Sequence, residues 1–492
     1  MKSGRATGFL LSGLALFFAG CTVGPKYQRA SAPVPAHWDA PEPWRESAPS
    51  DSLSKGAWWE VFHDETLNAL EKDSLAANQT LRIAAAHLEQ ARASAAIQVS
   101  TQFPQFATSP FAERQRLSGN RATTIGSPAN GIPITQSAYS LPFAVSYEVD
   151  LFGRRRRTIE AAQASYQATA ADLENSRLIV AAELAADYFT LRQVDAQIAL
   201  LRRTVETLSR GLDLVNSRHK GGIASGLDVA QEETLLNTTR TQSILLRQQR
   251  KQLEDAIAIL VGKPAPDFHL DPKELDAEPP AINAGIPSDL LERRPDIAEA
   301  ERQMAVANAQ VGIARAAYFP SLTLYANGGW QAADIAKLLN VQSTVWAIGA
   351  NAAETIFSGG QRRAQMQFAR AGYDASVAGY RQTVLNAFGE VQDSVTGMVV
   401  LNEAQKSQQD AVDAARRTLA IAESRYTGGL VSYLDVVSAQ QNLLNNEQQM
   451  AVIRGQKLVT SVLLVKSLGG GWDASSLAAL QVKPKLKDVV AP

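Results

Sequence analysis

The chain has 492 residues, 45% of them apolar, and a formal net charge of −1. This balance excludes the basic excess typical of a nucleic-acid-binding protein, and the apolar content excludes a chain that is disordered throughout. Cys21 is the only cysteine, so no disulfide can form within the chain.

Residues 1–20 have the pattern of a secretory signal peptide. A short basic region precedes an apolar stretch from Gly8 to Phe18, which is too short to span a bilayer. The stretch ends in Phe-Ala-Gly-Cys, and Cys21 resembles the lipidated cysteine of a bacterial lipobox. Because Thr22 and not an acidic residue follows, that resemblance implies a palmitate-bearing lipoprotein of the outer membrane. The alternative is an ordinary signal peptide with a chance cysteine.

Residues 21–57 are rich in proline, alanine and serine, a composition typical of an extended tether. A second proline-rich stretch, 263–287, is expected to link two halves of the chain, and 469–492 is expected to be a C-terminal tail. No segment after the signal peptide forms an uninterrupted apolar run long enough for a transmembrane helix. Any further membrane contact must then come from a closed β-barrel, because open strand edges are not tolerated in lipid.

The two halves, 58–262 and 288–468, are expected to be tandem copies of one unit. IASGLDV at 223–229 corresponds to LVSYLDV at 430–436, an offset of 430 − 223 = 207 residues. Each heptapeptide follows a pair of glycines, Gly221 and Gly222 in the first copy and Gly428 and Gly429 in the second. Repetition of this kind indicates two similar structural units.

Each copy is predicted to run helix, strand, loop, strand, long helix, turn and helix. The strands are expected at about 104–113 and 138–150 in the first copy, and at about 320–327 and 344–355 in the second. Apolar and polar residues alternate through 138–150, the period of a strand, over the length that a tilted barrel strand needs. A soluble hairpin packed on the helices explains the same alternation equally well.

The predicted helices are long. From about Arg154 to Ser217 there is no proline, and apolar residues recur at a spacing of three and four, the pattern of a coiled-coil seam. The second copy has a similar seam between Val377 and Leu401. A helix of about 65 residues extends roughly 95–100 Å, which suits a rod or the wall of a tube and not a compact globule.

Four strands per chain are too few to close a membrane barrel, for which about eight is the practical minimum. Unclosed edges would pair with other chains. If the strands cross a membrane, several chains must share one barrel, and three chains supply twelve strands. The expected fold is therefore mainly α, with a long coiled-coil α-barrel continuous with a twelve-stranded β-barrel shared by three chains.

Three segments resemble the TolC family of outer-membrane efflux proteins, in particular its NodT-type lipoprotein branch. They are WWEVFHDETLNAL at 58–70, EVDLFGRRRR at 148–157 and ERRPDIAEAERQMAVANAQVGIARAAYFPSLTL at 292–324. The resemblance runs from about residue 20 to 470. It implies a homotrimer in the outer membrane, with a helical barrel in the periplasm and the linker 263–287 in an equatorial belt.

The resemblance also implies the partners and the activity. The channel would dock on a periplasmic adaptor (membrane fusion) protein, which couples it to an inner-membrane pump, of the RND type. It would be a passive duct for drugs or other small molecules, not an enzyme, with no cofactor besides the covalent lipid and no nucleic-acid partner. The glycine pairs at the two turns are expected to let an adaptor hairpin approach closely. Their simpler role is to give the backbone freedom at a tight turn.

A gate is implied at the periplasmic end of the tube. Leu434 and Asp435 match the family's apolar and acidic rings, Asp228 is the first-copy counterpart, and Tyr426 matches a tyrosine that links neighbouring helices. Both aspartates stand three residues after a serine, which is equally well explained by helix capping.

Other functions fit part of the sequence. A duct for type I protein secretion would have the same architecture, and a non-pore structural coiled-coil lipoprotein would have the same helices. The alternating strands argue against the second. A periplasmic hydrolase finds no support, because the five histidines are scattered and no His-Glu-x-x-His pairing occurs. The sequence does not identify the cargo.

Overall fold

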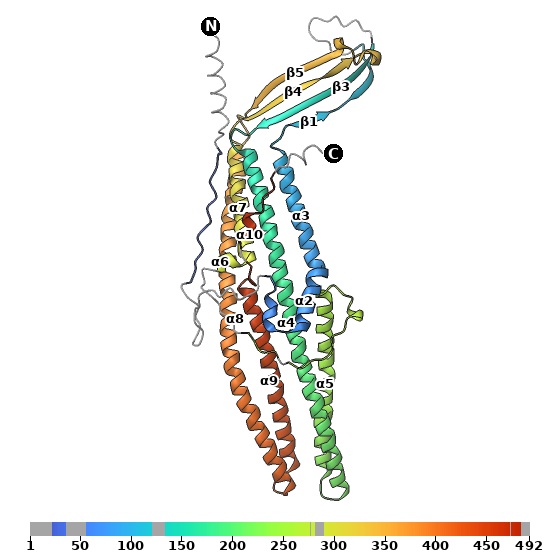
Figure 1. Cartoon of the computed structure of the whole chain (residues 1–492), viewed down its shortest axis with the longest axis vertical. Helices are drawn as coiled ribbons and strands as arrows, with labels where there is room; N and C mark the ends of the chain where they lie inside the picture. The colour runs from blue at the N-terminus through green and yellow to red at the C-terminus, as the bar shows by residue number, and fades with distance from the viewer. Residues whose placement is uncertain are drawn as a thin grey trace.

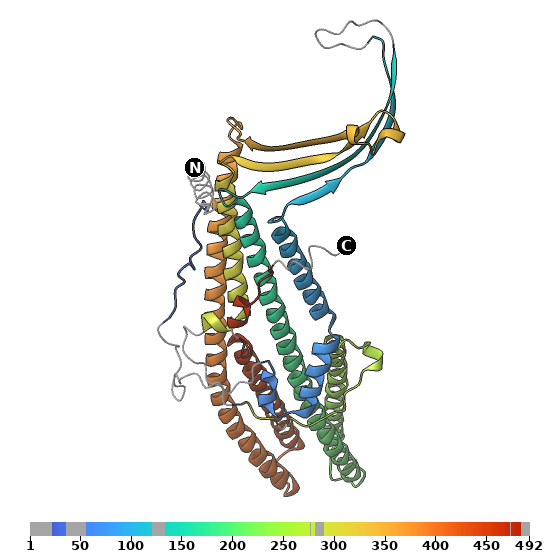
Figure 2. The same cartoon turned by 45° about the horizontal axis from the view of Figure 1, so that its top comes forward.

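The computed structural model describes residues 22–35, 56–120, 133–275, 277–280, 290–472 and 474–483. The predicted signal peptide and Cys21 lie outside these ranges, as do part of the predicted tether, part of the linker and the end of the tail. Within the described chain, a long bundle of helices carries a curved sheet at one end (Figures 1 and 2).

Six helices form the bundle in two matching sets. They are α3 (Gln79–Ser100), α4 (Arg154–Lys220) and α5 (Gly226–Leu260) in the first half, and α7 (Pro295–Ala316), α8 (Gln361–Thr427) and α9 (Tyr433–Ser467) in the second. α4 and α8 have 67 residues each, so each extends about 100 Å and runs from the sheet to the far tip (Figure 1). Among the described residues, no helix combines the length and apolar content needed to span a bilayer.

Short elements surround the middle of the bundle. They are η1 (Trp58–Phe62), α2 (Glu65–Ala77), η2 (Ala265–Asp267), α6 (Leu290–Arg293) and α10 (Ser475–Ala478). The largest apolar core lies at this level, where Trp58 and Trp59 are buried against residues of α4, α8 and α9. The two indole rings meet edge to face, with centroids 5.9 Å apart. The core therefore ties the two repeats together halfway along their length.

A buried charge network holds the linker between the repeats against α4 and α5. The guanidinium of Arg192 donates to Asp195 at 2.8 Å and to the carbonyl of Asp271 at 2.8 Å. Arg250 donates to the same Asp195 carboxylate at 2.7 Å, and Glu254 accepts a bond from the backbone N–H of Leu270 at 2.7 Å. Buried charges need this kind of pairing, and here the partners belong to three segments that the chain must bring together.

The strands form one antiparallel sheet at the other end of the bundle (Figure 2). They are β1 (Gln105–Thr108), β2 (Phe111–Leu117), β3 (Ile134–Val149), β4 (Ser321–Ala332) and β5 (Thr344–Ala353), and two short helices, η4 (Ile335–Lys337) and η5 (Val341–Ser343), connect β4 to β5. Their order is β1-β3-β4-β5, with β2 also paired to β3. Neither β5 nor the β1–β2 side has a further partner among the described residues.

The single strand predicted over about 104–113 is two strands, and it continues to Leu117. Thr108 pairs with Phe143 and Phe111 with Ser140, so β1 and β2 share one register and only residues 109–110 leave the ladder. Pro110 has no N–H to donate, and the opposite segment contains Pro142, which lacks one too. β3 also begins earlier and β4 ends later than predicted.

Residues 22–35 lie extended along the outside of the bundle, starting at the junction of sheet and helices (Figure 1). A side chain at Gly153 would meet Thr22 at 2.8 Å, so Thr22 sits at the start of α4. Arg157 donates to the carbonyl of Pro25 at 2.9 Å, the Tyr27 hydroxyl to Glu301 at 3.0 Å, and Arg29 to the Tyr380 hydroxyl at 3.1 Å. These bonds fasten the segment to α4, α7 and α8.

Candidate functional site

The candidate gate lies at the far tip of the bundle, where two helical hairpins turn. In both turns the second glycine is left-handed, with φ 74° at Gly222 and 71° at Gly429, a conformation that favours glycine. A side chain at either position would meet nothing within 4 Å. Within the chain these glycines therefore serve the turn, and the space beside them is open.

Asp228 and Asp435 each close a capping box at the start of the returning helix. The Asp228 carboxylate accepts from the backbone N–H of Ser225 at 2.9 Å, and that of Asp435 accepts from Ser432 at 3.0 Å. Both aspartates are exposed. Capping explains their position, and it leaves their charge at the tip.

We expect Asp435→Asn to keep this cap and Asp435→Ala to lose it. An amide oxygen can still accept the backbone bond, whereas alanine cannot, and the loss of one such hydrogen bond costs about 1 kcal/mol. Melting temperatures of the two variants and of the wild type in detergent measure the difference. An equal loss in both variants would show that the charge, and not the hydrogen bond, stabilises this turn.

Tyr426 belongs to a cluster that joins the two hairpins. Its ring lies 5.0 Å from that of Tyr433, and the guanidinium of Arg218, at the end of α4, lies 5.1 Å from its centroid. Tyr433 is buried with Val215 and Ala224 of the first hairpin. We call these five residues the tip cluster. It is the contact through which the end of the second hairpin packs on the end of the first.

Glu232 on α5 extends the tip cluster with a buried carboxyl. It is fully buried, and burial raises its pKa while the neighbouring Tyr433 hydroxyl opposes that rise. The hydroxyl lies beside the carboxyl but outside good hydrogen-bond geometry. An isolated charge is costly to bury, so this contact is sensitive to any movement of one hairpin relative to the other.

Leu434 is not part of the apolar cluster that contains Tyr433, and it is 53% exposed. It is accompanied by three more exposed apolar side chains at the turns, Ile223, Leu227 and Leu430. Leu434 and Leu227 are equivalent in the two copies, as are Leu430 and Ile223, since the members of each pair stand 434 − 227 = 207 and 430 − 223 = 207 residues apart. The single chain therefore presents an apolar tip that nothing within the described residues covers.

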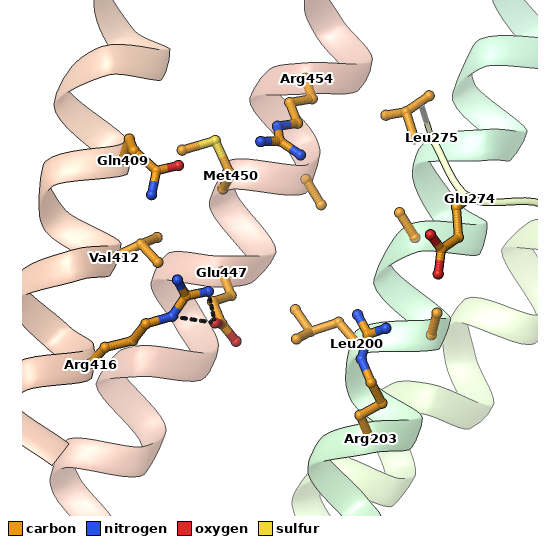
Figure 3. A pocket seen from close by; sticks show the side chains of 13 residues that line it. Leu200, Arg203, Glu274, Leu275, Gln409, Val412, Arg416, Glu447, Met450 and Arg454 are labelled. Carbon is orange, nitrogen blue, oxygen red and sulfur yellow. Dashed lines mark hydrogen bonds and ion pairs between the residues drawn. The ribbon is translucent and has the colours of Figure 1, made fainter. Parts of the chain in front are cut away.

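A charged groove separates the two helical hairpins closer to the short elements that surround the middle of the bundle (Figure 3). It has a volume of about 410 Å³ and lies between α4 on one side and α8 and α9 on the other. Arg203 and Arg454 face it from opposite sides, and Arg416 pairs with Glu447 at 2.7 Å across α8 and α9. The hairpins thus meet through apolar side chains at the tip and are separated by water-accessible charge above it.

The sequence prediction missed Tyr433, Glu232 and Arg218. A signal for two of them was present in the repeat. Tyr433 stands where the first copy has Gly226, and Glu232 stands where the second copy has Ala439. Positions at which otherwise similar copies differ in size and charge are the ones through which the copies can pack on each other.

Known proteins with similar sequences and similar structures were found for this chain. The family model described as "Outer membrane efflux protein" matches residues 70–263 and 286–470, one match in each repeat. The toluene efflux pump outer membrane protein TtgC of Pseudomonas putida is 34% identical over 461 residues, covering 93% of this chain and 94% of its own.

Solved structures agree with the sequence comparison. The outer-membrane channel OprN is 29% identical with a TM-score of 0.84, over 92% of this chain and all of its own. The open state of the MtrE outer membrane channel of Neisseria gonorrhoeae is 26% identical with a TM-score of 0.79, over 92% and 99%.

Proposed function

Because this chain belongs to the outer membrane efflux protein family, we propose that it is the passive outer-membrane duct of a tripartite efflux system. The duct takes small molecules from a periplasmic adaptor and an inner-membrane pump and releases them outside the cell. The observation that carries the proposal is the full-length similarity to TtgC, combined with a sheet whose two edges lack partners among the described residues. The chain itself contributes a path and a gate and catalyses no reaction.

The pore is formed by three copies. One chain supplies a curved sheet of four strand positions, β1 and β2 together counting as one, and a membrane barrel needs about eight strands or more. Three copies give twelve positions and leave no open edge. The long helices of the three copies continue the barrel as a tube into the periplasm.

The tip cluster holds the tube closed. In a trimer, Leu434 and Asp435 each occur three times around the axis, giving an apolar constriction and a ring of carboxylates that attracts cations. Opening requires the second hairpin to move away from the first, which separates Tyr433 from Glu232. The similar MtrE channel was solved in an open state, which supports two states for the tip. Docking of the adaptor on the exposed apolar turns would favour the open one.

The duct is anchored by a lipid on Cys21. Thr22, the first described residue, lies against Gly153 at the junction of sheet and helices, which supports an anchor near the membrane surface. We expect mass spectrometry of the mature protein to find a chain that begins at Cys21 and carries acyl groups. Cys21→Ser should lack that mass and shift a fraction of the protein into the soluble periplasm. An unmodified mature N-terminus in the wild type would remove the anchor from this account.

The cargo is a small apolar molecule, by likeness to a relative named for toluene efflux. Deleting the gene should raise the accumulation of an apolar dye such as N-phenylnaphthylamine several-fold, and the intact gene should restore efflux. Cys21→Ser, which leaves the pore intact, separates the anchor from the transport. Unchanged dye accumulation with a protein lost from the medium would favour type I secretion instead.

A further inference from the structure

Two long edges of the sheet end without a partner in the described chain, and they carry unusually exposed apolar side chains. Ile356, just after β5, is 98% exposed, Trp346 on β5 is 79% exposed, and Phe106 on β1 is 68% exposed. An unpaired edge of this kind is a template for another strand. On the proposed function, on which this inference rests, that strand belongs to the next copy of the chain.

The two repeats correspond with constant offsets. α3 and α7 both have 22 residues and start 295 − 79 = 216 residues apart. α4 and α8 start 361 − 154 = 207 residues apart, and α5 and α9 start 433 − 226 = 207 apart, with equal lengths in each pair. No residue is gained or lost within any of these helices.

The same offsets hold inside the sheet. Gln105 of β1 pairs with Ser146 of β3, and Ser321 of β4 pairs with Ala353 of β5. The second pair follows from the first, since 105 + 216 = 321 and 146 + 207 = 353. The strand pair of the first repeat therefore has the same register as the strand pair of the second. In this correspondence β1 and β2 together are equivalent to β4, and β3 is equivalent to β5.

The remaining contact within the chain, β3 on β4, then serves as the template for the contact between chains. Val149 pairs with Leu322, and Tyr139 with Ala332. Each β3 residue corresponds to the residue 207 positions later in or just after β5, and each β4 residue corresponds to the residue 216 positions earlier in β1 or β2. The two pairs therefore correspond to Ile356 with Phe106 and to Trp346 with Arg116. We infer that β5 of one copy pairs antiparallel with β1 and β2 of the next copy in this register, Ile356 opposite Phe106 and Trp346 opposite Arg116.

The side chains at these positions suit the contact. Ile356 and Phe106, both exposed in the single chain, cover each other, because residues directly opposite on an antiparallel pair lie on the same face. Trp346 faces the exposed Arg116, a cation–π pair. The register also gives residues 354–356 a strand partner, which they lack within the described chain because β4 begins at Ser321, opposite Ala353.

The face on which these pairs lie is already aromatic. The rings of Phe106 and Phe143 stack at 5.9 Å, and Phe143 meets Trp330 at 6.4 Å. Trp330 pairs with Thr344 of β5, and Trp346 stands two residues after Thr344. Because side chains on a strand alternate between the two faces, Trp346 lies on the same face as Trp330. The inferred register continues this row from one copy into the next.

Cysteine pairs test the register. Ile356→Cys with Phe106→Cys, and separately Trp346→Cys with Arg116→Cys, are purified reduced as assembled protein and then oxidised with copper phenanthroline. Opposite residues have Cα atoms about 4.5–5.5 Å apart, within disulfide reach. Both pairs should lose the monomer band and give covalent dimer and trimer that a reductant reverses. Within one chain β1 and β5 are three strand spacings apart, about 14 Å, so an internal disulfide does not form.

Shifted pairs are the matched controls. Ile356→Cys with Thr108→Cys, and Trp346→Cys with Arg114→Cys, stay on the same face but are two residues out of register, about 7–8 Å apart and beyond disulfide reach. Thr355→Cys with Ala107→Cys is a directly opposite pair in the same register on the other face, so it should cross-link as the matched pairs do. The wild type, with Cys21 alone, sets the background. Cross-linking of the shifted pairs in place of the matched ones overturns the register but keeps the shared barrel. A monomer by size, with no pair cross-linked, overturns the shared barrel of the proposed function and the register with it.

Discussion

Tyr433→Ala is expected to raise the open fraction of the channel by roughly 10- to 100-fold. Truncating a buried aromatic ring removes about 3–5 kcal/mol of packing. Part of that loss falls on contacts within the second hairpin, which leaves about 1.5–3 kcal/mol between the hairpins and shifts a two-state equilibrium by the stated factor. The loss acts on the closed state because the ring packs on Val215 and Ala224 of the other hairpin.

The measurement is single-channel recording in a planar bilayer, supported by uptake of a large hydrophilic antibiotic in cells without the pump. Leu444→Ala is the matched control, since Leu444 is equally buried on α9 but lies outside the tip cluster. It should lower the stability of the protein without opening the pore. Equal conductance in both variants would show that the tip cluster is not what holds the channel closed.

Glu71→Gln is expected to stabilise the protein by about 3 kcal/mol at pH 7. Glu71, on α2, is fully buried, and among the described residues neither carboxylate oxygen has a hydrogen-bond partner. Burial raises its pKa from an ordinary 4.5 to about 9. The folded state therefore holds a proton that the unfolded chain releases. The contribution of Glu71 to the stability of the wild type is therefore most favourable below pH 4.5 and falls as the pH rises toward 9, by about 1.4 kcal/mol for each pH unit.

Melting temperatures in detergent between pH 5 and pH 9 check this prediction. The wild type should lose stability relative to Glu71→Gln as the pH rises, and the two curves should approach each other near pH 5. Glu60→Gln, at an exposed glutamate in the same belt, should follow the wild type. Parallel curves for the wild type and Glu71→Gln would mean that the carboxyl is not held neutral in the folded protein.

The long helices and the two repeats were predictable because their signals are local and repeated. An apolar seam without proline defines α4 over tens of residues, and the glycine pairs mark both turns. The fold class and the family are confirmed by the comparisons. The equal lengths of corresponding helices, by contrast, come from the structure, since the offset of 207 between the turn motifs fixes only one end of each long helix.

The break between β1 and β2 was not predicted, because it depends on which residues face each other across the ladder. Pro110 alone is compatible with an edge strand. The interruption appears only when the register brings residues 109–110 opposite the segment with Pro142. Strand pairing between distant segments is not encoded in the alternation of either strand.

The site was predictable in part. Both aspartates cap helices, as their spacing from serine suggested. Tyr426 contacts Arg218 of the other hairpin, and the gate role that the resemblance implies for it stays a prediction. Whether Asp435 and Leu434 also form rings depends on other copies of the chain and stays a prediction. Glu232 could not be recognised from the sequence, because a glutamate on an amphipathic helix is usually solvated, and its burial follows from how the two hairpins pack.

Electron microscopy of the mature protein, extracted from outer membranes in mild detergent, decides whether three copies form one hollow duct. A shared barrel predicts a hollow particle with threefold symmetry, one end inside the detergent belt and a helical tube of roughly 100 Å beyond it. A compact monomer or a thin solid rod would contradict the duct, and with it the gate and the strand register between copies.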